Sequence, residues 1–340
     1  MTETEITDLA ENGVYKATPL KGKVEHTHIS WVIISGKNAF KIKKPVALNF
    51  LDFSRLKERK GFCEKELRLN QRFSGIYLDV LPVRQTDHSW QIGEGDGKIV
   101  DYAVRMKKMA ASQRMDKMLR QGRVQTSHIL SLVDQIVAFH QNAAVIDRPF
   151  DAIEAASNFN DLQSVRPFVE KQLGGNYADI IDLSIQCSDS FLNVYGTRMR
   201  ERVRLGYQRD LHGDLHSGNI FIYKEPVIFD CIEFNDHFRQ IDVLSEVAFF
   251  CMDLEYWDQS ALSGLFMGQY ADRLPCMTSP DDQRIFTYYK IVRANIRAKV
   301  HALSAMEDGE SENGEELKAC RKYLDLMRSY TDSWLALNHE

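Results

Sequence analysis

The first hundred residues alternate short apolar runs with turn-forming residues, which is typical of β-strands. Residues 30–35 (SWVIIS) are rich in β-branched and aromatic side chains, and the polar turn 36–38 separates them from the alternating run 39–43 (AFKIK). Two such runs joined by a short turn predict a β-hairpin. The same reasoning predicts further strands at 80–83, 89–92 and 99–106, and one helix from Ser54 to about residue 73.

From about residue 112 the apolar positions recur at helical spacing instead. Helices are expected from residue 126 or 127, over 178–205 and after 239, with a short strand-rich stretch over 212–234. The pattern therefore predicts an α+β fold in two lobes. A small lobe with an antiparallel sheet and one helix covers residues 1–108, and a larger helical lobe covers residues 109–340.

Composition narrows the classes of function. The chain of 340 residues carries 43 Lys and Arg against 48 Asp and Glu, a net charge of −5, which argues against a dedicated nucleic-acid binder. No apolar run approaches the roughly 18 residues of a membrane helix, so no membrane partner is expected. The six cysteines are dispersed without C-x-x-C spacing, and the N-terminus has no leader pattern. These features predict reduced thiols and a cytoplasmic protein.

The candidate chemistry is concentrated between residues 210 and 233. His212 and Asp214 are followed by Asn219, and Asp230 ends an apolar strand eleven positions later. Phosphoryl transfer needs one carboxylate that orients an acceptor hydroxyl and takes its proton. It also needs oxygen ligands, here an Asn and an Asp, that hold Mg²⁺ on the nucleotide phosphates. The spacing H-x-D-x-x-x-x-N matches a kinase catalytic loop.

This motif resembles the aminoglycoside phosphotransferase-like family of the protein-kinase-like superfamily, and is most similar to a bacterial subgroup of uncertain substrate. Gly213 replaces the Arg of protein kinases, and His216 stands where many of them carry Lys; both features are typical of small-molecule kinases. The resemblance implies a two-lobed kinase-like fold and an enzyme that transfers phosphate from ATP, with Mg²⁺, to a hydroxyl of a small molecule. Asp214 would be the catalytic residue, and Asn219 and Asp230 the metal ligands. The acceptor, the choice of ATP over GTP and the oligomeric state stay open.

A kinase also needs a strand lysine and a helix glutamate upstream. Lys41 and Lys43 share one face of their strand; Lys41 is preferred by resemblance, and Lys43 remains a competitor. Glu66 falls in an apolar helical stripe, where a carboxylate needs a partner, whereas Glu64 falls on a polar face. We expect Lys41 to contact the α- and β-phosphates and Glu66 to hold it. The glycine-rich phosphate loop is missing, and Ser30 is the candidate contact in its place.

Several other interpretations stay open. By resemblance, the segment 107–111 is the hinge that holds adenine, with Met109 as the candidate residue. A kinase acting on a macromolecule, a non-catalytic nucleotide-binding regulator, and a metal hydrolase using His212 and His216 are the alternatives to a small-molecule kinase.

Residues around the motif are expected to be structural. His212 should bond within its loop, Asp242 should anchor backbone N–H groups of that loop, and Glu233 should pair with a nearby arginine rather than assist the metal. A basic stripe at helical spacing is expected to be a solvated face, with an anionic acceptor site as the alternative. The stripe consists of Lys290, Arg293, Arg297 and His301.

Overall fold

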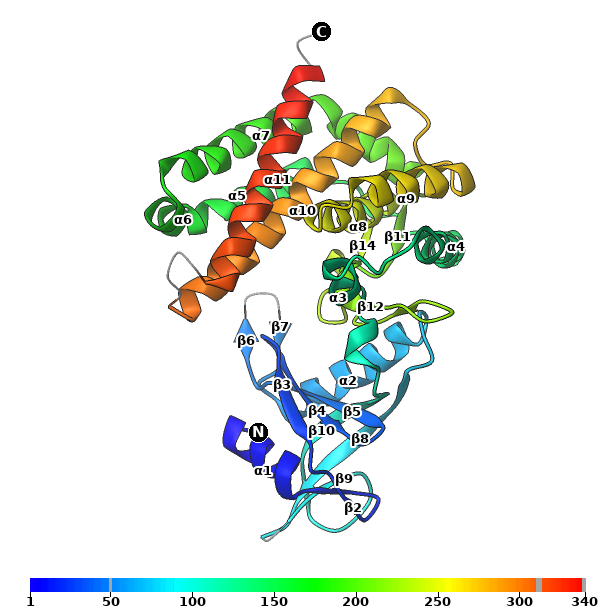
Figure 1. The fold of residues 1–340 in the computed structure, drawn as a ribbon, viewed down its shortest axis with the longest axis vertical. Helices are drawn as coiled ribbons and strands as arrows, with labels where there is room; N and C mark the ends of the chain where they lie inside the picture. Colours follow the sequence, from blue (N-terminus) through cyan, green and yellow to red (C-terminus); the bar gives the residue numbers. More distant parts are fainter. Residues whose placement is uncertain (49–50, 88, 310–313, 338–340) are drawn as a thin grey trace. The chain divides into compact units, whose positions relative to one another are not determined.

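The computed structural model describes residues 1–48, 51–87, 89–309 and 314–337 (Figure 1). The chain divides into two compact units, one of Met1–Met118 with Gly218–Arg239 and the other of Leu119–Ser217 with Gln240–Glu340. The first unit thus extends past residue 108 and takes in residues 218–239, which the sequence pattern assigns to the helical lobe. None of the described helices combines the length and the apolar character that crossing a bilayer requires.

The first unit is built on an eight-stranded sheet, within which β1 and β9 pair in parallel and the other neighbours are antiparallel. The predicted hairpin is present as β4 and β5, with Val32 opposite Lys41. In spatial order the strands are β2 (Thr18–Pro19), β1 (Val14–Tyr15), β9 (Trp90–Ile92), β8 (Tyr77–Gln85), β10 (Lys98–Lys107), β5 (Asn38–Lys43), β4 (Ser30–Ser35) and β3 (Lys23–His26).

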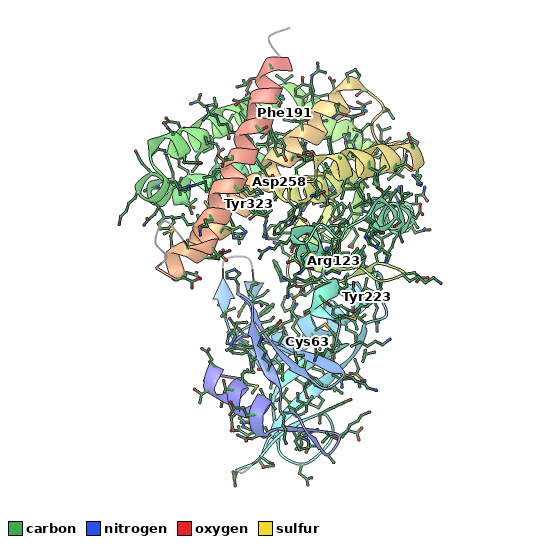
Figure 2. All side chains as sticks on the ribbon, in the orientation of Figure 1. Cys63, Arg123, Phe191, Tyr223, Asp258 and Tyr323 are labelled. Carbon is green, nitrogen blue, oxygen red and sulfur yellow. The ribbon has the colours of Figure 1, made fainter. Side chains whose placement is uncertain are left out.

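Two helices accompany this sheet, α1 (Glu3–Asn12) and α2 (Leu56–Asn70). Phe40 and Ile42 of β5 pack in one apolar cluster with residues of α1. Cys63 of α2, which is labelled in Figure 2, packs in another cluster. Side chains alternate along a strand, so Lys41 and Lys43 point away from the α1 cluster. The helix predicted from Ser54 begins instead at Leu56, and no side chain caps it.

Short elements complete the first unit. The hairpin β12 (Ile220–Phe221) and β13 (Val227–Ile228) is tied to it by a bridge between Phe221 and Arg114. This pairing explains why residues 218–239 belong with the first unit. The remaining elements of this unit are β6 (Ala47–Leu48), β7 (Leu51–Asp52) and the short 3₁₀ helices η1 (Ala111–Gln113) and η4 (Asp236–Phe238). Two further elements, the 3₁₀ helix η3 (Ser217–Asn219) and the helix α3 (Met115–Arg120), each cross a boundary between the units.

The second unit is helical, with one two-stranded sheet formed by β11 (Gln208–Asp210) and β14 (Gln240–Asp242). One of its apolar clusters joins α7, α8, α10 and α11, with Phe249 of α8 fully buried among them. Because α8 is apolar on nearly all sides, it is buried along most of its length. The elements are α4 (Thr126–Asn142), α5 (Ala152–Asn160), η2 (Asp161–Val165), α6 (Arg166–Leu173), α7 (Gly175–Arg204), α8 (Val243–Tyr256), α9 (Ser260–Arg273), α10 (Pro280–Glu307) and α11 (Glu315–Leu337).

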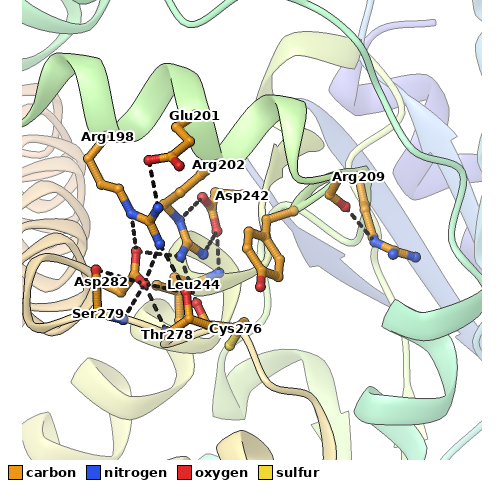
Figure 3. Close-up of polar contacts among 12 residues, drawn as sticks. Arg198, Glu201, Arg202, Arg209, Asp242, Leu244, Cys276, Thr278, Ser279 and Asp282 are labelled. Carbon is orange, nitrogen blue, oxygen red and sulfur yellow. Dashed lines mark hydrogen bonds and ion pairs between the residues drawn. The ribbon is translucent and has the colours of Figure 1, made fainter.

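A buried arginine joins the end of α7 to the starts of α8 and α10 (Figure 3). Arg202 donates to Asp242 (Nε to Oδ2, 2.7 Å) and to Asp282 (Nη1 to Oδ1, 2.9 Å). The Asp242 side chain also accepts a hydrogen bond from the backbone N–H of Leu244, which caps α8. Asp242 therefore anchors α8 rather than backbone N–H groups of the 212–219 loop, so that prediction was wrong.

Candidate active site

The predicted site residues fall into two groups, one within each compact unit. The first unit contains Ser30, Lys41, Glu66, Met109, Asn219 and Asp230, and the second contains Asp214.

Lys41 is the centre of the first group. Its Nζ lies 2.9 Å from Oε1 of Glu66 and 2.5 Å from Oδ1 of Asp230. Strand β5 supplies the lysine, α2 supplies Glu66, and Asp230 follows β13 along the chain. Glu66 is fully buried, whereas the side chain of Asp230 is 39 % exposed. The lysine is therefore held from a buried side by Glu66 and meets a more accessible carboxylate at its other contact.

Lys43 shares this carboxylate network. Its Nζ lies 2.8 Å from Oε2 of Glu66 and also contacts Glu233. Glu233 thus pairs with a lysine rather than with the predicted arginine. Lys41 and Lys43 lie on the same face of β5, and each contacts one oxygen of Glu66. The strand face alone therefore could not show which of the two lysines pairs with Glu66. Lys41 alone of the two contacts Asp230 in the described structure.

Burial and charge pull the pKa values of this group in opposite directions. Burial alone would lower the pKa of Lys41, but Asp230 and Glu66 outweigh it and raise that pKa well above its ordinary value. Burial would raise the pKa of Glu66, yet Lys41 and Lys43 lower it to about 2. Burial, with the charge of Glu66, raises the pKa of Glu233. Lys41, Lys43 and Glu66 are consequently charged at neutral pH.

The backbone around Asp230 is unusual. Its φ angle of +64° lies in the left-handed region that non-glycine residues rarely adopt. Neighbouring side chains hold this conformation, since the Asp230 N–H donates to the Tyr77 hydroxyl (3.1 Å) and the Cys231 N–H donates to Oδ1 of Asn70 (2.9 Å). Strain of this kind persists only where the surroundings determine it, and it is frequent at functional sites.

The backbone of Asn219 is hydrogen-bonded to the residue before Asp230. Its carbonyl oxygen accepts a hydrogen bond from the Phe229 N–H at 3.1 Å, next to Asp230. Both residues offer oxygen atoms, and Mg²⁺ bound with a nucleotide typically takes one or two carboxylates from the protein and the rest from phosphates and water. This donor set fits such an ion. The described residues contain no cluster of three or more His, Cys, Asp or Glu side chains suited to a metal.

Ser30 and Met109 lie elsewhere in the first unit. Ser30 is buried on β4 opposite Lys43, and its N–H donates to Oγ1 of Thr27 at 2.9 Å, closing the turn before the strand. Met109 is half-buried and packs on the apolar cluster that includes Cys63. Their contacts with a nucleotide stay predictions.

The second group is the loop around Asp214. The Asp214 N–H donates to Nδ1 of His212 at 3.2 Å, so His212 bonds within the loop as predicted. Gly213 between them has a φ of +86°, a conformation that favours glycine over the Arg of protein kinases.

A buried glutamate of α8 fixes this loop. Glu246 accepts hydrogen bonds from the backbone N–H groups of His212 (3.1 Å) and Gly213 (2.6 Å), and its Oε1 lies 3.1 Å from Nε2 of His140. His140 is itself satisfied by the Tyr270 hydroxyl at 2.7 Å, as expected for a core histidine. Glu246 therefore fills the anchoring role that the sequence assigned to Asp242.

Asp253 anchors the far end of the loop in the same way. Its Oδ2 accepts the Ser217 N–H at 2.8 Å, and the Ser217 hydroxyl accepts the indole N–H of Trp257 at 3.1 Å. Glu246 and Asp253 are seven positions apart on α8, hence on one face. Sequence reasoning missed both residues. The available signal was an acid within an otherwise apolar helix, because a buried carboxylate requires partners.

Part of the basic stripe on α10 also faces the loop. Arg293 is buried, and its Nη1 donates to the carbonyl oxygen of Gly213 at 3.1 Å. The expectation that this stripe is a solvated face was therefore wrong for Arg293. An amphipathic pattern cannot show which neighbour covers a face, and here that neighbour is the 212–217 loop.

Asp214 lies among basic side chains. Nε2 of His216 is 3.4 Å from its Oδ2, and the side chain of Asp214 is 38 % exposed. Burial would raise the pKa of Asp214, but His216, Arg297 and His212 outweigh it and hold the pKa well below its ordinary value. Asp214 is thus an ionised, accessible carboxylate on a loop that Glu246 and Asp253 hold in place, as a group that accepts a proton or orients a hydroxyl must be.

The sequence and the fold of the chain were compared with those of known proteins. No family model matches it. Uncharacterized proteins of Mycobacterium bovis and Mycobacterium tuberculosis are 29 % identical to it over 286 residues, which is 82 % of this chain and 54 % of each relative. The chain therefore spans about half the length of the curated relatives it matches.

Two solved structures share the fold. Choline kinase from Cryptosporidium parvum has a TM-score of 0.57 at 10 % identity, covering 99 % of this chain and 97 % of its own. A thermostable mutant of an aminoglycoside phosphotransferase has a TM-score of 0.50 at 12 % identity, covering 91 % of this chain and 94 % of its own. The predicted resemblance is confirmed at the level of the fold.

Proposed function

The chain has the two-lobed, protein-kinase-like α+β fold, and we propose that it is an ATP- and Mg²⁺-dependent phosphotransferase acting on a hydroxyl of a small molecule. The observation that carries this proposal is the buried Lys41 held between Glu66 and Asp230. Kinases bind the nucleotide phosphates with a lysine that a buried glutamate keeps charged, next to an accessible aspartate.

Each residue then has a physical task. Lys41 contacts the α- and β-phosphates and Glu66 keeps its ammonium group in place. Asn219 and Asp230 would hold Mg²⁺, which would neutralise charge on the phosphates. Asp214 accepts the proton of the acceptor hydroxyl. Since Lys41 pairs directly with Asp230 in the described structure, nucleotide binding requires this ion pair to open, and the lysine exchanges one anionic partner for another.

The experiment is transfer of ³²P from [γ-³²P]ATP with the purified chain and a cell extract separated by ultrafiltration into small molecules and macromolecules. We expect a labelled product in the small-molecule fraction with the wild type. Asp214→Asn and Lys41→Met should reduce it at least about a hundredfold. Lys37→Met, an exposed lysine in the β4–β5 turn, is the matched control and should retain activity.

Other outcomes contradict the proposal in distinct ways. Label confined to the macromolecular fraction indicates a kinase acting on a protein or nucleic acid with the same fold. Transfer by Asp214→Asn at the wild-type rate shows that Asp214 is not the catalytic residue. No transfer into either fraction, combined with binding of MgATP, indicates a nucleotide-binding regulator.

A further inference from the structure

A cation whose direct contacts include no carboxylate lies on α10, one turn beyond Arg293. Arg297 is half-buried, and its Nη2 donates to Nε2 of His301 at 3.1 Å. Its guanidinium group is 5.5 Å from the ring centroid of Tyr323 on α11. Within the part of the chain that the structure describes, no Asp or Glu lies within salt-bridge distance of Arg297.

Two other members of the same stripe, Lys290 and His301, pair with carboxylates of the second unit, whereas Arg293 bonds to a backbone carbonyl and keeps a buried Nε without a partner among the described residues. Lys290 pairs with Glu255 at 3.1 Å, and Arg293 donates to the Gly213 carbonyl at 3.1 Å. His301 lies 2.6 Å from Glu316. Arg297 has a ring nitrogen and an aromatic face as its direct contacts, and although burial would lower its pKa, the nearby charges of Asp214 and Asp253 help to raise it. A carboxylate or phosphate supplied from outside the chain would add the direct charge-assisted contact that the described residues do not provide.

Arg297 is also close to the predicted proton acceptor. Arg293, one helical turn earlier, contacts Gly213, the residue before Asp214. The Phe249 ring lies 4.9 Å from the Arg293 guanidinium and 5.4 Å from the His216 ring, and His216 in turn contacts Asp214. Arg297 is among the charges that lower the pKa of Asp214. A small molecule with its hydroxyl at Asp214 would therefore have Arg297 as a neighbour.

We propose that Arg297 binds an anionic group of the acceptor, a carboxylate or a phosphate, while Asp214 receives the acceptor's hydroxyl. This inference rests on the proposed function and names the class of acceptor, a hydroxylated small molecule that carries a negative charge. The hydroxyl oxygen forms a bond to the γ-phosphorus of ATP, and its proton passes to Asp214. The bond from that phosphorus to the bridging oxygen breaks, and ADP leaves. A cationic acceptor would be repelled by Arg297.

Anion binding tests the inference without any transfer reaction. The probe is inorganic phosphate, titrated into the full chain by isothermal calorimetry. We expect the wild type to bind it, and Lys41→Met is included to identify phosphate that binds at the proposed nucleotide site instead. Arg297→Gln should weaken binding about ten- to a hundredfold, the range for one charge-assisted contact. Arg297→Lys should recover part of the loss, and Arg321→Gln, an exposed arginine of α11, should change nothing.

Three results overturn the inference. They are no phosphate binding by the wild type in the millimolar range, unchanged binding by Arg297→Gln, and loss of binding in Lys41→Met alone. Circular dichroism and thermal unfolding of each variant separate a lost contact from a lost fold. Because this assay contains no nucleotide, its failure is distinguishable from failure of the proposed kinase activity, which is judged by ³²P transfer.

The transfer reaction supplies a second readout. The labelled product is purified, and mass spectrometry identifies the acceptor from which it was formed. We expect this acceptor to carry a carboxylate or a phosphate of its own, and Arg297→Gln to lower kcat/KM for it at least tenfold. An acceptor that is neutral or cationic at neutral pH contradicts the inference.

Discussion

Removal of the Glu246 carboxylate should destabilise the second unit by an amount that its contacts allow to be calculated. Glu246→Ala leaves two backbone N–H groups, of His212 and Gly213, without their acceptor, and leaves His140 without its carboxylate. Glu246 is 1 % exposed. Each buried donor left unsatisfied costs about 1–3 kcal/mol, so the two backbone groups alone give a loss of about 2–6 kcal/mol.

The assay is urea unfolding followed by circular dichroism, with Glu170→Ala as the matched control. Glu170 is 52 % exposed and pairs with Arg166 one turn away, so its removal should cost about 0.5 kcal/mol or less. A Glu246→Ala variant within about 0.5 kcal/mol of the wild type would refute the reasoning, because it would mean that these N–H groups find water or other partners at no cost.

The pH dependence of this effect has a definite sign. Burial would raise the pKa of Glu246, but His140, His212 and the Gly213 N–H outweigh it and lower the pKa below its ordinary value of 4.5. A lowered pKa in the folded state means that the stabilisation is fully present above pH 4.5 and is lost as the pH falls through the folded-state value. The difference between wild type and Glu246→Ala should thus be constant from pH 6 to 8 and shrink below about pH 4.

Three further predictions concern other residues. Lys43→Met removes the contact of buried Glu233 and should cost about 3–5 kcal/mol in urea unfolding, whereas an equal loss in Lys44→Met, near the surface, would show that the buried pairing is not the cause. His216→Gln removes the imidazole that, with Arg297 and His212, holds the pKa of Asp214 down, so the acid limb of the pH–rate profile for phosphate transfer should move to higher pH. An unmoved limb would separate Asp214 from catalysis. All six cysteines are buried, and burial raises the pKa of four of the thiols to about 12. Mass spectrometry should therefore find iodoacetamide labelling at pH 8 only after unfolding in urea. Rapid labelling of the native chain would contradict this burial.

The sequence was most informative where local pattern decides structure. The β4–β5 hairpin follows from β-branched runs around a polar turn, and the helix that carries Glu66 follows from its apolar stripe. The strand face that carries Lys41 and Lys43 follows from alternation alone. The contact between Lys41 and Glu66 could be predicted because a carboxylate on a buried stripe requires a cation, whereas the simultaneous contact of Lys43 with the same carboxylate was not predicted.

Long-range pairing was beyond the same reasoning. Glu246 and Asp253 stand out as acids in an apolar helix, but nothing local shows that their partners lie more than thirty residues earlier in the chain. Asp242, at the start of the same helix, was the predicted anchor, but it pairs with Arg202 of α7 instead. The stripe on α10 was misjudged for the same reason, since helical periodicity identifies a face without identifying what covers it.

The central claim, that Lys41, Glu66 and Asp230 form a site for MgATP, is tested most directly by nucleotide binding. Thermal unfolding is followed with ATP, with and without Mg²⁺, for wild type, Asp230→Ala and the exposed control Asp96→Ala. A ligand at about 100 times its Kd stabilises the folded state by about 2.7 kcal/mol. We predict that ATP with Mg²⁺ raises the Tm of wild type and Asp96→Ala by the increase that such a stabilisation produces. The Tm of Asp230→Ala should not rise. No increase with any nucleotide in the wild type, or an equal increase in Asp230→Ala, would contradict the account.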